Sequence, residues 1–224
     1  MTEPMAIVLA AGKGTRMKSD LPKVLFPVRN RPMIEFVLDA IRSCGVVRIL
    51  VVVGYRSDLV RQELQGQPGV EFIEQTEQLG TGHAVAMCRE QLGQHHGPVL
   101  IVTGDSPLTQ GDSIRTLLED FETKRPACIL GTINKPEPGN LGRIVRGTDG
   151  EFLGIVEAKD ASETQRAITE VNMSTYVFDS QKLLRALNEM GNDNQQKEYY
   201  ITDCPGILKS QGEDVLALAV LNPC

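Results

Sequence analysis

Several features that would mark a serine hydrolase or a membrane protein are missing from this sequence. Its 224 residues include no tryptophan and only three histidines, and no Ser/His/Asp grouping for nucleophilic catalysis is evident. His95 and His96 are adjacent and expected to be exposed, whereas His83 is expected at the start of a helix. No hydrophobic run approaches the ~18 residues of a membrane span, because the longest, at 46–53, is broken by Arg48. A membrane partner is therefore not expected.

Cysteines are few and share no pattern. They are odd in number, lie far apart and form no C-x-x-C pair: Cys44, Cys88, Cys128, Cys204 and Cys224. This usage favours reduced thiols in a cytoplasmic protein and argues against a zinc site or a disulfide framework. No basic segment precedes the apolar N-terminal residues, so a secretory signal is not expected either.

Basic residues are the minority, 23 against 29 acidic residues, which gives a net charge of −6 and a pI near 5.2. An acidic protein of this kind is not expected to bind nucleic acid. The first 30 residues reverse this balance. Their charged members are Lys13, Arg16, Lys18, Lys23 and Arg29 against Glu3 and Asp20. This local surplus of positive charge favours a small anionic ligand near the N-terminus.

The remaining composition is that of a globular protein, with 41% hydrophobic and 23% charged residues. A chain of this length can bury roughly 70% of its unfolded surface. No Gly/Ser linker, low-complexity tract or internal repeat divides it. We therefore predict a single domain over residues 1–224, made of one half at 1–133 and a second at 134–224, where the predicted strands become shorter.

Short β-branched runs alternate with amphipathic stretches in the first half. We predict strands at 5–11, 48–53, 70–73, 98–103 and 127–133, and helices at 32–43, 58–64, 82–92 and from Asp112, which can cap its helix. Strands at 143–145, 152–156 and 173–178 and a helix capped by Ser180 are predicted in the second half. This order builds a mostly parallel sheet between helix layers, a Rossmann-like three-layer α/β sandwich. Such sheets bind ligands at the carboxyl ends of their strands.

The loop after the first strand is the most informative segment. It reads L-A-A-G-K-G-T-R-M at 9–17 and carries glycines and cations suited to a phosphate. It is not a Walker loop, because G-K-[ST] is absent at the required spacing, and a methionine replaces the third glycine of the dinucleotide fingerprint. An ordinary strand-to-helix turn is the alternative. Thr15, Arg16 and the later Pro22-Lys23 favour phosphate binding.

Six segments, specific as an ordered set, extend this pattern along the chain. They are G-K-G-T-R-M with S-D-L-P-K-V-L, E-Q-L-G-T-G-H-A (77–84), T-G-D-S-P-L (103–108), G-I-V-E-A-K-D-A (154–161), E-V-N (170–172) and E-Y-Y-I-T-D (198–203). From residue 6 to about 204, the chain resembles the sugar-1-phosphate nucleotidyltransferases, and among them the pyrophosphorylase domain of bacterial N-acetylglucosamine-1-phosphate uridyltransferases. The resemblance implies the nucleotide-diphospho-sugar transferase fold and the synthesis of UDP-N-acetylglucosamine and pyrophosphate from UTP and N-acetylglucosamine 1-phosphate.

By this resemblance, Arg16 and Lys23 are the catalytic residues. A sugar phosphate, with a second pKa near 6, is already ionised at neutral pH and needs no general base. The obstacle is repulsion between anions, about 4 kcal/mol for each pair of unit charges at ~4 Å and an effective dielectric of 20. Cations lower that barrier, so a direct in-line displacement without a covalent enzyme intermediate is expected.

The resemblance also makes Asp105 the ligand of Mg²⁺, which bridges phosphate oxygens. Taken alone, an aspartate after a strand is more often a turn or cap residue. The family's second metal ligand, an asparagine in a G-V-N segment, has no counterpart before Cys224. Either the sequence is part of a longer chain or water takes that position. The acetyltransferase domain often fused to this family is likewise not expected here.

Further residues are assigned by their positions in the motifs. The nucleotide-binding residues are Leu9, Ala10, Ala11, Gly12, Gly14, Gln75, Gly80 and Thr81, with the Gln75 amide reading the uracil edge. The sugar-binding residues are Thr103, Gly104, Gly142, Glu157 and Asn172. Residues 1–133 are thus the expected nucleotide-binding half and 134–224 the sugar-binding half. The sequence departs from the family at N-M-S (172–174), where N-T-G is usual, and at Thr103, where tyrosine is frequent.

Alternatives remain open at this stage. Without the motifs, Gln75 and Glu157 would be interpreted as solvated strand ends. Tyr199, Tyr200 and Thr202 suit packing as well as substrate contact. Two rival functions are a glucose-1-phosphate uridylyl- or thymidylyltransferase and a non-catalytic nucleotide-sugar sensor.

Overall fold

Strands and helices alternate through the first half of the chain in the computed structural model, which describes residues 3–14 and 19–220. The strands are β1 (Met5–Ala10), β4 (Arg48–Val53), β5 (Val70–Glu74), β6 (Pro98–Thr103) and β7 (Cys128–Asn134). The helices are α1 (Met33–Ser43), α2 (Ser57–Glu63), α3 (Thr81–Ala86), α4 (Arg89–Gln94) and α5 (Gly111–Lys124). A 3-10 turn, η2 (Lys23–Leu25), and a small hairpin of β2 (Pro27–Val28) and β3 (Arg31–Pro32) precede α1.

The second half adds shorter strands and two further helices of eight or more residues. Its strands are β8 (Arg143–Arg146), β9 (Phe152–Val156), β10 (Glu170–Asp179) and β11 (Val215–Leu218). Its helices are α6 (Glu163–Arg166), α7 (Ser180–Glu189) and α8 (Asp203–Ser210). The sequence did not predict α6 or α8. Within the described residues, no helix is long and apolar enough to cross a membrane.

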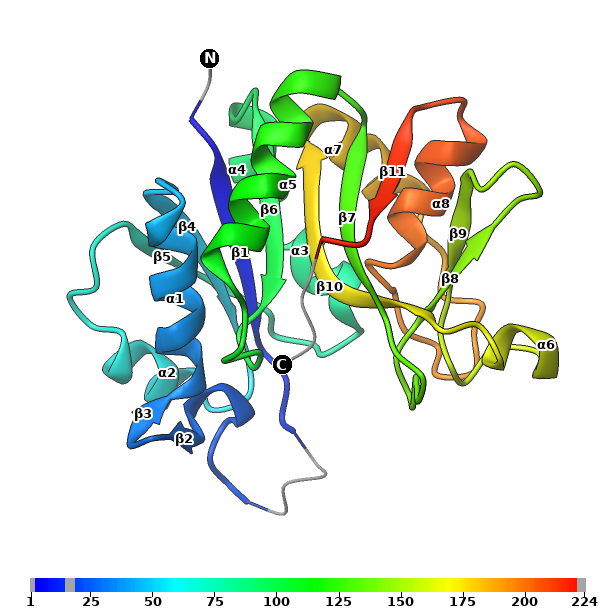
Figure 1. The fold of residues 1–224 in the computed structure, drawn as a ribbon. Helices are drawn as coiled ribbons and strands as arrows, with labels where there is room; N and C mark the ends of the chain where they lie inside the picture. Colours follow the sequence, from blue (N-terminus) through cyan, green and yellow to red (C-terminus); the bar gives the residue numbers. More distant parts are fainter. Residues whose placement is uncertain (1–2, 15–18, 221–224) are drawn as a thin grey trace.

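All the larger strands join one nine-stranded sheet, ordered β11-β7-β10-β6-β1-β4-β5, from which β8 and β9 extend beside β10. Strand β1 is parallel to both β4 and β6, whereas β10 runs antiparallel between β6 and β7. Figure 1 shows α1 and α5 on one face of the sheet and α7 behind it. The predicted Rossmann-like α/β sandwich is confirmed. The strand order reverses at β1 and β6, which is where such sheets form their binding crevice.

Two apolar cores lie on opposite faces of the sheet because successive strand residues point to opposite sides. In β1, Met5 and Ile7 pack on the side of α3, α4, α7 and α8, while Ala6 and Val8 pack on the side of α1, α2 and α5. All four side chains are fully buried. This two-sided burial explains why β1 is continuously hydrophobic.

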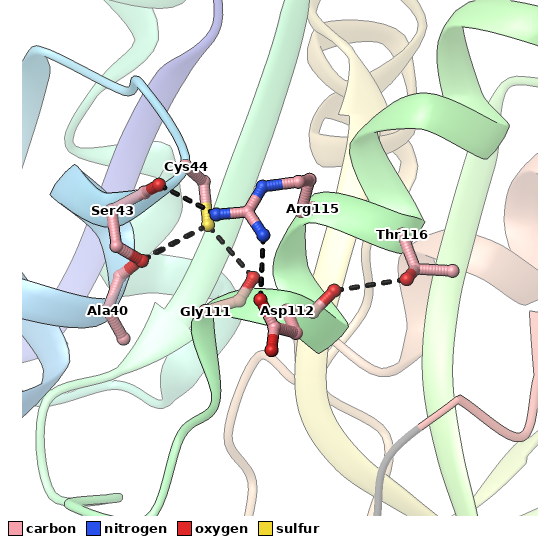
Figure 2. Close-up of polar contacts among 7 residues, drawn as sticks. All are labelled: Ala40, Ser43, Cys44, Gly111, Asp112, Arg115 and Thr116. Atoms are coloured by element: carbon pink, nitrogen blue, oxygen red, sulfur yellow. Dashed lines mark hydrogen bonds and ion pairs between the residues drawn. The ribbon is translucent and has the colours of Figure 1, made fainter.

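Side-chain contacts join the end of α1 to the start of α5 and correct the predicted cap of α5 (Figure 2). The Cys44 thiol donates to the Gly111 carbonyl (3.0 Å), and Arg115 Nη2 donates to the Ser43 carbonyl (2.9 Å). Asp112 lies inside α5, where it pairs with Arg115 Nη1 at 2.6 Å, and the N-cap residue is Gln110. The prediction that Asp112 caps the helix was wrong because this carboxylate is held by the arginine one turn later.

A second cap prediction, at Ser180, was also wrong. Asp179 is the N-cap of α7, since its carboxylate accepts from the main-chain N–H groups of Gln181 and Lys182. The Ser180 hydroxyl instead donates to the His95 carbonyl at 2.6 Å. His95, expected to be exposed, is 8% exposed and lies 3.2 Å (Nε2) from the Pro98 carbonyl. Burial lowers the pKa of His95, and the hydrogen bond from Ser180 places this histidine where the end of α4 meets the start of α7.

The single helix predicted at 82–92 is two helices, α3 and α4. The break falls at Cys88, whose N–H donates to the Val85 carbonyl in a tight i−3 turn and whose backbone has φ −89° and ψ 14°. The Cys88 side chain is fully buried in the core, and this packing favours the local turn over a continuous helix.

Candidate active site

A pocket of about 680 Å³ opens at the carboxyl ends of β1 and β6. All eight predicted nucleotide-binding positions line it: Leu9, Ala10, Ala11, Gly12, Gly14, Gln75, Gly80 and Thr81. Lys23, Thr103 and Asp105 line it as well. Parallel strands place residues from distant parts of the sequence at one sheet edge, which is why the loop motif and the T-G-D motif meet here.

The glycine-containing loop follows β1 directly and is held against neighbouring segments. The Ala11 carbonyl accepts from the Tyr55 N–H at 3.0 Å, and the Leu9 carbonyl accepts from the Gly104 N–H at 2.9 Å. Gly14 has a φ of 65°, and a Cβ on it would lie 2.7 Å from the Cβ of Lys23. Glycine is therefore required there for close approach of the loop to Lys23. Because the Gly104 N–H already donates to the Leu9 carbonyl, it is not free to donate to a ligand.

Opposite charges meet in the lining of the pocket. The Lys23 ammonium forms an ion pair with the Asp105 carboxylate, with side-chain exposures of 41% and 26%. Lys13 Nζ lies 5.2 Å from the centre of the Tyr55 ring, a cation–π contact that keeps a second positive charge at the pocket wall. The Thr103 hydroxyl lies 2.9 Å from that of Ser106. Both lysines remain accessible to an anionic ligand.

Asp105 suits a hard divalent cation, because such ions prefer carboxylate oxygens and take one or two of them with phosphate and water completing the shell. No group of three His, Cys, Asp or Glu side chains that could hold a metal occurs among residues 3–14 and 19–220. Asp105 therefore fits a cation that takes a carboxylate oxygen from the protein and its other ligands from phosphate or water.

Gln75 follows β5 and is 3% exposed, so the alternative of a solvated strand end does not hold. Its side-chain Nε2 lies 3.1 Å from the Gly80 carbonyl and 2.9 Å from His83 Nδ1. Its main-chain N–H donates to the Val53 carbonyl at 2.7 Å. The amide is thus fixed in the wall of the pocket.

Gly142, Glu157 and Asn172 form a second cluster, away from the lining of the pocket. A Cβ on Gly142 would lie 3.5 Å from Glu157 Oε1 and 3.7 Å from Asn172 Cβ, and the Asn172 N–H donates to the Gly142 carbonyl at 2.9 Å. The Thr202 hydroxyl donates to Glu157 Oε1 at 2.9 Å. Three strands or strand ends and the start of α8 thus converge on one polar spot.

Acidic groups gather at this second cluster. Burial raises the pKa of Glu157, against the effect of the Thr202 hydrogen bond. Burial, with repulsion from Glu157 and Asp160, raises the pKa of Asp203 to about 6. The cluster is therefore rich in acceptors and poor in positive charge, which suits hydroxyl and amide donors of a sugar better than a phosphate.

The departure at N-M-S leaves the backbone in the conformation that a glycine would favour. Ser174 has a φ of 54°, in the left-handed region, at the irregularity where the pairing of β10 with β7 shifts between Asn172 and Tyr176. Asn172 donates to the Tyr176 hydroxyl (2.6 Å) and accepts from the Ser174 N–H (3.1 Å). Much of the asparagine's hydrogen-bonding capacity therefore holds this turn.

The segment 198–202 connects the pocket with the second cluster. Tyr199 donates its N–H to the Leu79 carbonyl (2.8 Å) and accepts from the Gly82 N–H (2.7 Å), while the Ile201 N–H donates to the Thr81 hydroxyl (3.1 Å). Thr202, next in the chain, reaches Glu157. Tyr200 is 8% exposed, which favours the packing alternative for its ring.

Sequence reasoning missed some lining residues and named one that lies outside the described residues. Val24, Gln78, Ala84 and Glu198 line the pocket without having been predicted there. Glu198 opens the E-Y-Y-I-T-D motif, so that motif was the available signal. Arg16, predicted to be catalytic, lies outside the described residues.

Comparison with known proteins identifies the family. The family described as the MobA-like NTP transferase domain matches residues 6–200. The chain belongs to this family. As a MobA-like NTP transferase domain, it is 46% identical over 210 residues to "Bifunctional protein GlmU" of Streptococcus gordonii, a match that covers 94% of this chain and 45% of that protein. It is 45% identical over 215 residues to GlmU of Exiguobacterium sp. AT1b, covering 96% and 47%.

The chain thus spans about half the length of these curated relatives, and the resemblance drawn from the motifs is confirmed at the level of the family. Solved structures support the fold. A UDP-glucose pyrophosphorylase complexed with UDP-glucose superposes with a TM-score of 0.78 at 16% identity, covering 97% of this chain and 91% of that one. A putative glucose-1-phosphate thymidylyltransferase of Bacillus anthracis gives 0.77 at 19%, covering 96% and 86%.

Proposed function

We propose that this MobA-like NTP transferase domain joins UTP and N-acetylglucosamine 1-phosphate to form UDP-N-acetylglucosamine and pyrophosphate. The observation that carries the proposal is the Lys23–Asp105 pair in a pocket lined by the predicted nucleotide-binding loop. A nucleoside triphosphate is an anion that is stabilised by a cationic side chain and by a divalent metal ion, which the protein must help to hold. In this pocket Lys23 supplies the positive charge, and Asp105, its ion-pair partner, supplies a carboxylate for the metal.

The sugar phosphate would attack the α-phosphorus of UTP, and pyrophosphate would leave. Lys23 is a mobile point charge that can part from Asp105 and follow the developing negative charge on the α-phosphate. The dipoles of the main chain at Gly12 and Gly14 add to this stabilisation. Arg16, on the same loop, would brace further phosphate oxygens with its forked guanidinium.

Asp105 would hold Mg²⁺ in this reaction. When bound, the metal neutralises part of the charge on the triphosphate. The chain's own residues would orient the reactants. Gln75, Gly80 and Thr81 line the pocket, where Gln75 would face the base and Gly80 and Thr81 would close over the nucleotide. Thr103 and Gly104, also predicted to bind the sugar, lie beside Asp105 at the end of β6.

The second cluster would receive the N-acetylglucosamine ring. Glu157 and the remaining lone pair of Asn172 Oδ1 would accept from its hydroxyl or amide groups. Gly142 keeps a side chain out of a spot where a Cβ would lie 3.0 Å from Ile155 Cγ2 and 3.5 Å from Glu157 Oε1. We infer that residues 1–133 bind the nucleotide and 134–224 the sugar, within one domain. The buried, unpaired thiols of Cys88, Cys128 and Cys204 suit a cytoplasmic enzyme.

Pyrophosphate release from UTP and N-acetylglucosamine 1-phosphate, with Mg²⁺ present, tests this proposal. Lys23→Ala and Arg16→Ala are each expected to lower the turnover by about 10²-fold or more, because each removes a cation that stabilises the transition state. Circular dichroism would establish that both variants fold. Glucose 1-phosphate and dTTP, offered in competition, decide between this reaction and its rivals within the family.

Lys124→Ala is the matched control, because Lys124 also pairs with an aspartate, Asp120, at a similar exposure of 44% but lies on α5, outside the pocket lining. Loss of this surface pair should leave the rate unchanged. Nucleotide binding with no pyrophosphate release would contradict the proposal and favour a sensor. Unchanged kinetics in both pocket variants would also contradict it.

A further inference from the structure

His83 contacts Gln75 in a way that determines which polar atom Gln75 can offer to a base. Gln75 is held first through its main chain. Its N–H donates to the Val53 carbonyl at 2.7 Å, and its carbonyl accepts from Gln78 Nε2 at 3.2 Å. The side chain therefore starts from a fixed point at the end of β5.

The orientation of the Gln75 amide follows from the chemistry of its two neighbours. A main-chain carbonyl can only accept, so the amide atom 3.1 Å from the Gly80 carbonyl must be the nitrogen. The second hydrogen of that nitrogen faces His83 Nδ1 at 2.9 Å. Nδ1 must then be the unprotonated nitrogen of a neutral ring. Both hydrogens of the amide are thus engaged.

Gln75 Oε1 remains available. None of the hydrogen bonds among residues 3–14 and 19–220 is donated to it, and Gln75 lines the pocket. A base that approaches Oε1 with an N–H gains a hydrogen bond, as uracil does with N3–H. Cytosine presents a lone pair at N3, and two acceptors facing each other repel.

We propose that His83 is a positioning residue that makes the pocket selective for uracil over cytosine by holding the Gln75 amide with Oε1 outward. This rests on the proposed function, in which Gln75 reads the base. Without an acceptor at position 83, one hydrogen of the amide loses its partner and only the Gly80 carbonyl still holds the nitrogen, so the amide turns more readily and donates a hydrogen to cytosine N3. Thymine also carries N3–H, so His83 does not distinguish UTP from dTTP.

His83→Leu and His83→Asn test the proposal as a pair. Leucine removes the acceptor, whereas asparagine places Oδ1 near the position of Nδ1 and can still accept. His83→Leu is expected to raise the KM for UTP about ten-fold, to leave the KM for N-acetylglucosamine 1-phosphate unchanged, and to lower the UTP:CTP ratio of kcat/KM by about ten-fold, since a buried donor loses its partner. His83→Asn should keep the KM for UTP and the UTP:CTP ratio of kcat/KM close to their wild-type values.

Calorimetric titration with UDP and CDP repeats the comparison without catalysis, and His83→Met replaces the leucine variant if that fails to fold. Equal UDP:CDP preference in the wild type and in the apolar variant would overturn the inference, as would equal behaviour of the apolar and asparagine variants. Preferential UDP binding without turnover would overturn the proposed reaction alone. Absence of nucleotide binding to the wild type would overturn both.

Discussion

Single side chains in this fold are held by contacts with particular neighbouring side chains, and the sequence could not show which partners those contacts use. The motif predicted Gln75 and Glu157 as binding residues, but the hydrogen bonds that fix them come from His83 and Thr202, which no periodicity singles out. The same limit explains the wrong cap at Asp112, whose carboxylate pairs with Arg115. Residue type is readable from sequence, whereas the choice between competing local partners depends on tertiary contacts.

Asp203 offers a prediction about stability and pH. Its pKa is about 6 in the folded protein, against about 4 in an unfolded chain, so the folded state binds more protons between those values. The free energy of unfolding therefore falls as the pH rises from about 4 to 6, and above pH 6 the whole of this loss is present. Asp203→Asn should raise the free energy of unfolding by about 1 kcal/mol at pH 7.5, after allowance for solvent screening, and by nothing near pH 4.

Urea unfolding at the two pH values measures this difference. Asp149→Asn, on the exposed turn between β8 and β9, serves as the control for the change in net charge. An equal gain in the free energy of unfolding at both pH values, or the same gain in the control, would show that the ionised Asp203 carboxylate does not destabilise the folded protein.

At the scale of elements, the pairing of 79–82 with 198–202 depends on a glycine. Gly80 has a φ of 108°, and a Cβ on it would lie 2.4 Å from the Tyr199 carbonyl oxygen. A main-chain atom cannot move aside as a flexible side chain can. The start of α3 is therefore joined to the segment before α8 through a contact that tolerates no side chain at this position.

Gly80→Ala is expected to destabilise the protein by about 3 kcal/mol, which combines the strain of positive φ with this clash, and to raise the KM for UTP. Gly212→Ala is the matched control, because Gly212 has a φ of 80° with open space around its Cβ. It should lose only about 1 kcal/mol. The two melting temperatures decide the matter: equal decreases would mean that the contact with Tyr199 is unimportant.

At the scale of the whole molecule, the alternating pattern predicted the layers and the sheet edge at which the pocket lies, because buried parallel strands are continuously apolar and their carboxyl ends share an edge. The pattern did not predict that β10 enters between β6 and β7, nor that it shifts register after Asn172. Pairing between strands far apart in the sequence depends on which strand edges the rest of the chain leaves unpaired, so no local pattern predicts it.

Ligand binding should stabilise the whole domain. At 100 times its dissociation constant, UTP with Mg²⁺ is expected to add about 2.7 kcal/mol and to raise the melting temperature by roughly 5–10 °C for a chain of this size. Uridine at the same concentration should give a much smaller shift, because it lacks the phosphates that Lys23 would contact. Equal shifts with the nucleoside and the triphosphate, measured by differential scanning fluorimetry, would show that the cations do not bind the ligand.

The central place of β10 also bears on attempts to split the protein. A fragment ending at residue 133 would retain β6 and most of β7 but lose the strand that separates them. Strand β7 would also lose β11, so unpaired main-chain groups would lie along one edge of β6 and both edges of β7, where other chains can pair with them. The isolated fragment should therefore precipitate unless 134–220 is co-expressed to reseal the sheet.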